Sequence, residues 1–330
     1  MGALSVGVVG VTGVVGEEIL RVLVKRQFPV RNLVPLASER SAAKKVRFAG
    51  EDIPVRVLGK DSFRGLDLVL FSAGAAISRQ HAPAAVDAGA LVVDNSSAFR
   101  LEPEVPLVVP EINADAARSH RGIIANPNCS TIIMVVAIAP IHRLSSLQRV
   151  TVSTYQAASG MGARGMDTLV RELRGEEVAD SPFPHRLADN LIPRIDVLQE
   201  NGYTKEEMKM VLETRKIMDL ENVPISVTCV RVPIKRAHSE SVQVTTERAL
   251  RLEEIRRALD EAPGVELEDS PHEDVYPTPL AVSGTDDVRV GRVRIHPDER
   301  NTYDFWVVGD QILKGAALNA VQIAEKVLTE

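Results

Sequence analysis

The sequence predicts an α/β protein with two domains, a doubly wound parallel sheet and an α+β domain with a mixed or antiparallel sheet. Three observations predict this. A glycine-rich turn directly follows the first apolar run, residues 4–9. Short apolar runs then alternate with helical patterns through the first half of the chain. From about Val150, β-branched runs follow one another with fewer helices between them, and the length of 330 residues suits two domains of about 150 residues.

Composition and charge exclude several classes of protein. Hydrophobic residues make up 45% and charged residues 25%, which is ordinary globular usage and argues against disorder, collagen and coiled coil. The net charge of −6, with no basic tail, argues against nucleic-acid binding. The longest apolar stretch, residues 132–141, is about half of the roughly 20 residues that a membrane span needs. With only two cysteines and no signal-like N-terminus, we expect a cytoplasmic protein without membrane or nucleic-acid partners.

The first half alternates strands with helices. We expect strands at residues 4–9, 33–37, 66–72 and 91–94, and helices at 17–25 and 81–88. Apolar residues at Ile19, Leu20 and Leu23 give the first helix a face that can pack on a sheet. The proline-spaced segment 102–110 is expected to be a loop.

The second half has longer strands. We expect them at residues 150–155, 225–234, 241–247 and 288–295. Between them, residues 204–218 form a predicted helix that opens with Thr204 and Glu207, the spacing of a capping box. The tail, residues 310–328, has helical periodicity.

The turn after the first strand has the features of a dinucleotide-binding turn. Glycines at Gly7, Gly10, Gly13 and Gly16 permit a tight turn and close approach of the backbone to a pyrophosphate at the following helix N-terminus. Their spacing departs from the strict G-x-G-x-x-G motif, and the alternative is a purely structural βα turn. Its position between an N-terminal strand and a helix favours a Rossmann-like, dinucleotide-binding domain.

The end of the second strand favours NADP. Ser38 and Arg40, with Lys44 and Lys45 close behind, suit a ribose 2′-phosphate. Glu39 is a conflicting signal, because a carboxylate there suits the free 2′-hydroxyl of NAD. The alternative is that this segment is a solvated charged loop.

A cysteine stands at a predicted helix start. In the segment 125–131, Pro127 cannot lie inside a helix, whereas Asn128 or Ser130 can cap one. Cys129 is therefore expected at a helix N-terminus, which favours a thiolate and suits a nucleophile. The alternative is a buried core cysteine, which is our interpretation of Cys229 in the middle of a strand.

Several short motifs together resemble aspartate-semialdehyde dehydrogenases, in that family's order and over nearly the whole chain. They are the glycine-rich start, Asn128-Cys129-Ser130-Thr131, Gln156-Ala157-Ala158-Ser159-Gly160, the segment from Arg231 to Glu240, and Lys314-Gly315-Ala316-Ala317-Leu318-Asn319. The resemblance implies reduction of L-aspartyl 4-phosphate to L-aspartate 4-semialdehyde with NADPH and release of phosphate, in the biosynthesis of lysine, threonine, methionine and diaminopimelate.

The resemblance also implies roles for individual residues. Cys129 matches the nucleophile that forms a thioester, His238 the acid/base, and Gln156 the residue that orients the acyl intermediate. The substrate-binding residues would be Arg231 for the carboxylate, Arg100 and Lys216 for the phosphate, and Glu213 near the amine. Taken singly, Glu213 and Lys216 could be a surface ion pair, and His238 a core or surface histidine.

The cofactor residues implied by the turn, the second strand and the family motifs form one set. They are Gly10, Thr12, Gly13, Val14, Val15, Gly16, Ser38, Arg40, Ser41, Ser72, Ala73, Gly74, Ser159, Gly160 and Gln311. Gln311 departs from the asparagine that the family pattern leads us to expect, which puts that contact in doubt. No metal site is predicted.

Residues 1–128 with 311–330 are expected to bind the dinucleotide, and residues 129–310 to carry catalysis and form a homodimer. Two alternatives remain open. One is N-acetyl-γ-glutamyl-phosphate reductase, which has the same chemistry on a longer, acylated substrate and would leave Glu213 without an amine to bind. The other is a catalytically silent NADP-binding sensor, which would not need Cys129 and His238.

Overall fold

The computed structural model describes residues 2–328 and divides into two compact units. The first contains Met1–Asn128 with Ala316–Glu330, and the second contains Cys129–Gly315. The chain leaves the first unit after Asn128, which is where the sequence places the boundary. It returns at Ala316 and not at residue 311, so residues 311–315 belong to the second unit. The side chain of Gln311 explains this, because it bonds to Ser159 and Ala237 within the second unit.

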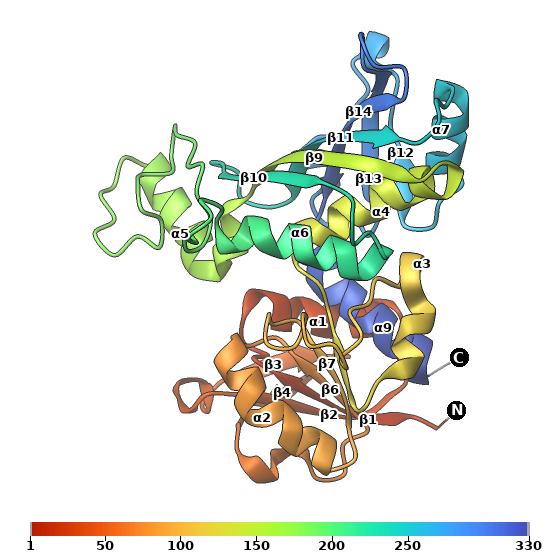
Figure 1. Ribbon diagram of the computed structural model, residues 1–330. Coiled ribbons are helices and arrows are strands. Elements are labelled where there is room, and N and C mark those ends of the chain that lie inside the picture. Colours follow the sequence, from red (N-terminus) through yellow and green to blue (C-terminus); the bar gives the residue numbers. More distant parts are fainter. Residues whose placement is uncertain (1, 329–330) are drawn as a thin grey trace. The chain divides into compact units, whose positions relative to one another are not determined.

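The first unit is built on a six-stranded parallel sheet (Figure 1). Its order is β5 (Arg56–Val57), β2 (Val30–Ala37), β1 (Leu4–Val9), β6 (Leu68–Phe71), β7 (Leu91–Asp94) and β8 (Ile123–Ala125). All neighbouring pairs are parallel. The chain runs from β1 outward to β2 and then returns to β6 on the other side, so the winding reverses between β1 and β6. The doubly wound sheet predicted from the sequence is confirmed.

Helices pack beside this sheet. They are α1 (Val14–Lys25), α2 (Ala75–Asp87), the short α3 (Pro110–Asn113) and α9 (Leu318–Leu328), and β3 (Lys45–Phe48) and β4 (Glu51–Pro54) form a separate hairpin. The buried Ile19, Leu20 and Leu23 of α1 form the apolar face expected from their spacing. Both α1 and α2 begin earlier than predicted, because small residues such as Ala75 and Ala76 in the first turn of α2 give little periodic signal.

The second unit contains a six-stranded mixed sheet, as predicted. Its order is β10 (Ile225–Arg231), β9 (Leu147–Gln156), β11 (His238–Thr246), β14 (Thr302–Gly309), β13 (Val288–Ile295) and β12 (Val265–Leu267). The two pairs at the edges, β10–β9 and β12–β13, are parallel, and the inner pairs are antiparallel. Strand β10 ends at Arg231 instead of Ile234, because Pro233 has no N–H for a ladder bond. Strand β14 was not predicted.

Helices α4 (Cys129–Leu144), α6 (Lys205–Met218) and α7 (Leu252–Asp260) pack against this sheet. The apolar helix α4 packs against β9, β11, β13 and β14, and α6 packs against β10 and α4 (Figure 1). The remaining helices are α5 (Gly162–Leu173) and α8 (Pro279–Val282). The predicted capping box of α6 is present, with Glu207 N–H donating to Thr204 Oγ1 and Thr204 N–H donating to the Glu207 carboxylate.

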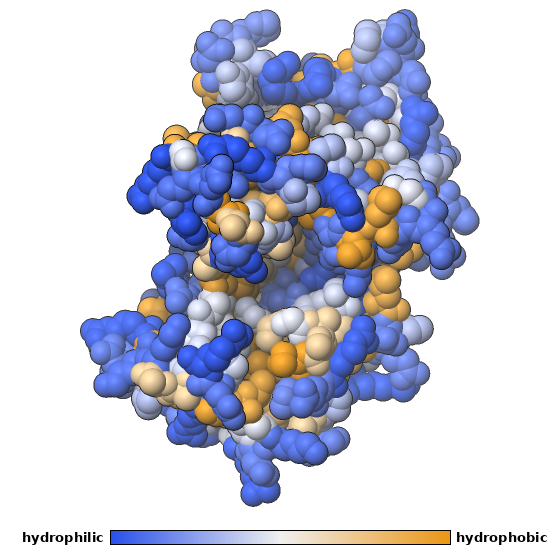
Figure 2. All heavy atoms as spheres, turned by 90° about the vertical axis from the view of Figure 1, so that its left-hand side faces the viewer, coloured by the Kyte–Doolittle hydropathy of each residue, from blue (hydrophilic) through white to orange (hydrophobic). Residues whose placement is uncertain are grey.

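Among residues 2–328, no helix combines the length and the apolar character needed to cross a bilayer. Figure 2 shows a face covered mainly by hydrophilic side chains, with apolar ones gathered in separate patches. Exposed apolar residues of the second unit include Leu191, Val197 and Leu198, each 58% exposed, in the segment between α5 and α6.

Candidate active site

A cavity of about 660 Å³ opens at the carboxyl ends of β1, β2 and β6 in the first unit. Backbone of the turn after β1 lines one side, and the ends of β2 and β6 line the others. In a doubly wound sheet, ligands bind at this edge, where the winding reverses. The cavity therefore has the position of a dinucleotide site.

Two glycines of the turn are sterically required. Gly10 has φ +79°, and a Cβ there would lie 2.5 Å from Ser72 O at the end of β6. A Cβ on Gly16 would lie 2.3 Å from Gly10 O. The turn is thus packed tightly against β6 and against the start of α1, with the N-terminus of α1 directly behind it. This close-packed turn before a helix N-terminus fits the pyrophosphate of a dinucleotide.

The lining includes seven of the predicted cofactor residues, namely Gly10, Thr12, Gly13, Ser38, Arg40, Ser72 and Ala73. Val14, Val15 and Gly16 form the first turn of α1, Gly74 caps α2, and Ser41 lies 3.2 Å from Thr12, hydroxyl to hydroxyl. Ser159, Gly160 and Gln311 belong to the second unit. The lining also contains residues that the sequence did not single out, namely the apolar Val9, Ala37, Val57, Leu58 and Ile77, and His81. Glu39, the conflicting signal for NADP, lines the cavity as well.

Arg100 is buried in the first unit beside the ends of β7 and β8. Its Nε donates to Asn126 O at 2.9 Å and its Nη2 to Asn95 O at 2.7 Å. Asn126 is itself fixed, since its amide donates to Asn95 Oδ1 and accepts from Asn319 Nδ2 on α9. The guanidinium is therefore held rigidly by backbone carbonyls.

In the second unit, Cys129 is the first residue of α4 and is partly buried. A Cβ on Gly315 would lie 2.8 Å from the Cβ of Cys129, so the chain at Gly315 packs directly against the thiol-bearing residue. One turn further along α4, Ile133 contacts Gly309 at the end of β14. Gly309 is the partner of His238 in the β-ladder, which places the first turn of α4 beside the start of β11.

His238 begins β11 and is fully buried. Its Nδ1 accepts a hydrogen bond of 3.0 Å from Ala157 N–H, and its Nε2 has no protein partner among the described residues. Burial, and then the positive charge of Arg231, hold the pKa of His238 well below its ordinary value. The imidazole is therefore neutral at physiological pH.

Arg231 ends β10, opposite Gln156 on β9. Its Nη1 donates to Ala157 O at 2.6 Å, and a Cβ on Gly160 would lie 2.6 Å from the same nitrogen, so Gly160 leaves room for the guanidinium. Burial lowers the pKa of Arg231, while Glu206, Cys129 and Cys229 act in the opposite direction. Arg231 is thus a buried cation within electrostatic reach of Cys129.

Gln156 is held at both ends of its amide. Thr154 Oγ1 donates to its Oε1 at 3.0 Å, and its Nε2 donates to Glu206 Oε1 at 3.2 Å. Lys209 Nζ lies 2.9 Å from both Glu206 and Asp196. Glu206 of α6, which the sequence did not single out, thus bonds to Gln156, and Lys209 bonds to Glu206. Their spacing of three residues is the same as that of Glu213 and Lys216, so spacing alone could not choose between the pairs.

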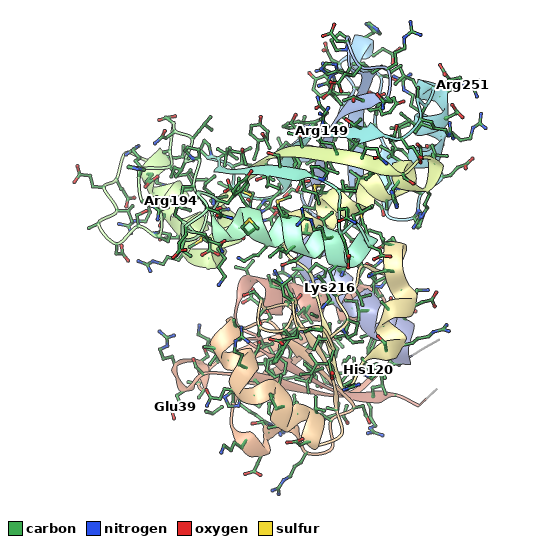
Figure 3. The ribbon with its side chains drawn as sticks, viewed as in Figure 1. Glu39, His120, Arg149, Arg194, Lys216 and Arg251 are labelled. Carbon is green, nitrogen blue, oxygen red and sulfur yellow. The ribbon has the colours of Figure 1, made fainter. Side chains whose placement is uncertain are left out.

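Glu213 lies seven residues beyond Glu206 on α6, or about 10.5 Å along the helix. It is buried, and Lys216 is half-buried toward the C-terminal end of α6 (Figure 3). The first turns of α6, not this end, hold the Gln156 contact. Glu213 therefore lies about two turns of α6 away from the Gln156 contact.

Gln311 ties two loops of the second unit together. Its Oε1 accepts from Ala237 N–H at 2.9 Å, and its Nε2 donates to Ser159 Oγ. Gln311 thereby links the loop after β9 to the residue that precedes His238. Cys229 is fully buried within β10, and burial is the main cause that raises the pKa of its thiol, which agrees with the predicted core role.

The comparisons with known proteins agree with this architecture. Residues 5–120 match the family model "Semialdehyde dehydrogenase, NAD binding domain", and residues 138–314 match "Semialdehyde dehydrogenase, dimerisation domain". These matches, the parallel sheet with its turn and the second sheet domain define a two-domain dehydrogenase.

Similar proteins and solved structures show which family of dehydrogenases the chain resembles. Aspartate-semialdehyde dehydrogenase of Aquifex aeolicus is 49% identical, with 98% of each chain covered, and that of Bacillus subtilis is 47% identical, with 98% of this chain and 96% of the other covered. A crystal structure of aspartate semialdehyde dehydrogenase II from Vibrio cholerae superposes with a TM-score of 0.95 at 43% identity, covering 99% of each chain. The same protein complexed with ASA gives 0.96 at 42% identity, covering 100% of this chain and 99% of the other. The chain belongs to the aspartate-semialdehyde dehydrogenase family.

Proposed function

We propose that this enzyme reduces L-aspartyl 4-phosphate to L-aspartate 4-semialdehyde with NADPH through a thioester on Cys129. The observation that carries the proposal is the assembly of Cys129, Arg231, His238 and Gln156 around one end of the second sheet. None of these residues suggests a function alone, but a helix-start thiol, a buried cation and a buried imidazole at the same end of one sheet are groups suited to acyl transfer.

The chemistry follows from these groups. The Cys129 thiolate attacks the acyl carbon, the carbon–sulfur bond forms, and the carbon–oxygen bond to phosphate breaks. Phosphate leaves with the bonding electron pair and takes up a proton, which leaves a thioester. The turn from Gly10 to Gly13 and the residues that line the cavity of the first unit would hold a nicotinamide dinucleotide, which would supply a hydride to the thioester. Cys129 would then leave as the thiolate as the aldehyde forms.

Substrate recognition requires groups for two anions and one cation. Arg231 is proposed to bind the α-carboxylate, for which its planar fork is suited, and Arg100 the phosphate. For the amine we propose Glu213, as the family resemblance implies, with Glu206 of the same helix as a second candidate because it contacts Gln156 and acts on the pKa of Arg231. Lys216 is proposed as a further phosphate ligand, and Lys209 is bonded to Glu206.

For the cofactor we propose NADP. Its pyrophosphate would lie at the turn from Gly10 to Gly13, and Ser38 and Arg40 would bind the 2′-phosphate. The lining position of Arg40 supports a 2′-phosphate, and the match to an NAD-binding family model supports a nicotinamide dinucleotide without distinguishing NADP from NAD. Glu39 also lines the cavity and opposes a 2′-phosphate by charge repulsion, so the preference depends on Arg40.

We further propose a cytoplasmic homodimer formed by the second unit, acting in biosynthesis of the aspartate family of amino acids. The match of residues 138–314 to a dimerisation-domain model supports the dimer. The half-buried aromatic rings of Tyr155 on β9 and Trp306 on β14, with centroids 5.3 Å apart, also support it, because they leave aromatic surface partly exposed on the sheet. Sedimentation at equilibrium measures the assembly directly, and a concentration-independent monomer would contradict it.

The test of the activity is phosphate-dependent reduction of NADP⁺ with L-aspartate 4-semialdehyde. NAD⁺ and the aldehyde of N-acetylglutamate serve as comparison substrates in parallel assays. We expect NADPH formation only when phosphate and the aspartate aldehyde are both present. Turnover of the acetylated substrate alone would indicate N-acetyl-γ-glutamyl-phosphate reductase, and NADP binding without any turnover would indicate a sensor.

A further inference from the structure

The cavity of the first unit has an apolar side, which is lined by Val57, Leu58, Ile77 and His81. We propose that this apolar side holds the adenine base of the dinucleotide, and that His81 recognises the base by donating a hydrogen bond from Nε2–H to adenine N1. His81 would thereby select adenine over hypoxanthine, which carries a hydrogen on N1. The inference rests on the proposed dinucleotide function of the cavity and adds to it the residue that recognises the base.

Leu58 and Ile77 come from two segments that pack together. Leu58 follows the edge strand β5, and Ile77 lies in the first turn of α2. The short 3₁₀ helix Lys60–Phe63 packs against α2, and both aliphatic side chains pack, partly buried, against one core cluster that contains Phe63 and Phe71. The faces of a purine base are flat and largely apolar, so these side chains suit a base better than a phosphate or a ribose.

His81 lies deeper in the cavity than Ile77. The two residues are four positions apart on α2 and therefore share one face of the helix. Helix α2 joins the parallel neighbours β6 and β7, so it runs back from the carboxyl end of β6, and His81 lies about 6 Å further from that edge than Ile77. The His81 side chain is 8% exposed and lines the cavity. A base that enters from the phosphate-binding turn would thus meet His81 with the edge farthest from its ribose, which carries N1.

The charge of His81 suits a base rather than a phosphate. Burial, and then the positive charge of Lys60, lower the pKa of His81. The imidazole is therefore neutral at physiological pH and offers one hydrogen-bond donor and one acceptor. Such a ring adds little to the binding of an anion, whereas it can pair with the polar edge of an uncharged base.

The surroundings of the two ring nitrogens show which one donates. His81 Nδ1 is buried and has no hydrogen-bond partner among the described residues, and the ring of Phe63 lies beside it with centroids 6.5 Å apart. A buried N–H without a partner is rarer in proteins than an unpaired acceptor, so Nδ1 carries the lone pair and Nε2 the proton. Nε2 is not buried as Nδ1 is, and within residues 2–328 it bonds to no other group. Because His81 lines the cavity, its Nε2–H is available to a ligand there.

The first experiment compares NADPH with its hypoxanthine analogue, in which oxygen replaces the 6-amino group and N1 carries a hydrogen. In wild type, the Kd measured by nicotinamide fluorescence should be about five- to tenfold higher for the analogue, because two N–H groups would then face each other. His81→Phe keeps a flat ring without a donor, so its Kd for NADPH should rise about fivefold and the two cofactors should bind within about twofold of each other.

Gln80→Ala, an exposed neighbour on α2 that does not line the cavity, is the matched control and should leave both Kd values unchanged. An unchanged Kd for NADPH in His81→Phe, or equal discrimination in wild type and His81→Phe, would overturn the proposal.

A second measurement uses the wild-type chain and does not depend on the folding of any variant. In nitrogen-15 NMR of imidazole-labelled enzyme, with His81 assigned by through-bond connection to its backbone, we expect a neutral Nε2–H ring. Its Nε2 signal should shift on titration with 2′-phospho-ADP-ribose, which contains adenine, and stay in place with reduced nicotinamide mononucleotide, which lacks it. A signal that does not move at saturating 2′-phospho-ADP-ribose would overturn the proposal. Absence of any NADPH binding to wild type would overturn the proposed cofactor site as well, so the two failures are distinguishable.

Discussion

The candidate sites of the two units differ in what shapes them, which is backbone packing in the first unit and buried side chains in the second. The cavity in the first unit is shaped by backbone, where Gly10 and Gly16 allow the turn to pack against Ser72 O and itself. The site in the second unit is shaped by buried side chains that hold one another, such as Gln156 between Thr154 and Glu206. A local change in the first site should act mainly through shape or surface charge. A change in the second should also disturb the neighbours of the altered residue.

The largest expected effect is the removal of the nucleophile. Cys129→Ala should lower turnover by at least about 10⁴-fold, because no other group in the second unit is proposed to form the thioester. Because Cys129 belongs to the second unit and the cofactor cavity to the first, NADPH affinity measured by fluorescence titration should remain within about twofold.

Cys229→Ala is the matched control for this variant. It removes the other thiol, which lies buried in β10, and should preserve most of the activity. A large loss of NADPH affinity in Cys129→Ala, or equal inactivation by both substitutions, would contradict the division of labour between the two sites.

The next effect distinguishes two carboxylates on the same helix. Glu206→Gln should lower kcat/KM for the aspartate aldehyde about 10²-fold, because it removes the charge that faces Gln156 and Lys209. Glu213→Gln, two turns away, should change the same ratio less than about tenfold. Steady-state kinetics at saturating NADP⁺ make the comparison. The opposite ranking would favour Glu213, the residue that the family resemblance implies.

The contrast between the units also explains what could be predicted from the sequence. The turn from Gly10 to Gly16 is a local feature, in which one strand, one turn and one helix follow directly along the chain, so its spacing and position were informative. Cys129 was likewise placed at its helix start by its neighbours, Pro127 and Asn128. Both signals depend on residues close in sequence.

The missed features of the second site depend on residues distant in sequence. Gln156 and Glu206 are separated by 50 positions, and Ala157 and His238 by 81. Their contacts arise from the register of β9 with β10 and β11 and from the packing of α6, none of which a single sequence displays. The assignment of Glu213 and Lys216, which the family resemblance implies, stays a prediction, whereas the contact of Glu206 with Gln156 became visible only in the fold.

A smaller effect should appear at the cofactor site, where the residues involved are exposed. Arg40→Ala should raise the Kd for NADPH about tenfold and leave that for NADH nearly unchanged, because only NADPH carries the 2′-phosphate. Glu39→Gln should lower the Kd for NADPH about two- to threefold by removing repulsion. Both changes should shrink at high ionic strength. Equal effects of Arg40→Ala on the two cofactors would contradict the 2′-phosphate assignment.

The smallest effect on turnover is expected at Glu240. This residue instead tests how burial of an unpaired carboxyl changes the free energy of unfolding with pH. This carboxyl lies on β11 opposite Thr154, is fully buried, and has no partner for either oxygen among the described residues. Burial holds its pKa well above the ordinary value of 4.5. The folded protein therefore retains a proton that the unfolded chain releases above that pH, so stability falls as pH rises, by at most about 1.4 kcal/mol per pH unit.

Glu240→Gln removes this titration and keeps the shape of the side chain. Denaturant unfolding at pH 5 and pH 7 should show a free energy of unfolding that rises in the variant relative to wild type as pH increases, with the difference vanishing below about pH 4.5. His238 has a lowered pKa and acts in the opposite direction below 6.5, but it is present in both proteins and cancels in the comparison. A difference independent of pH would mean that Glu240 is ionised or solvated in the folded protein.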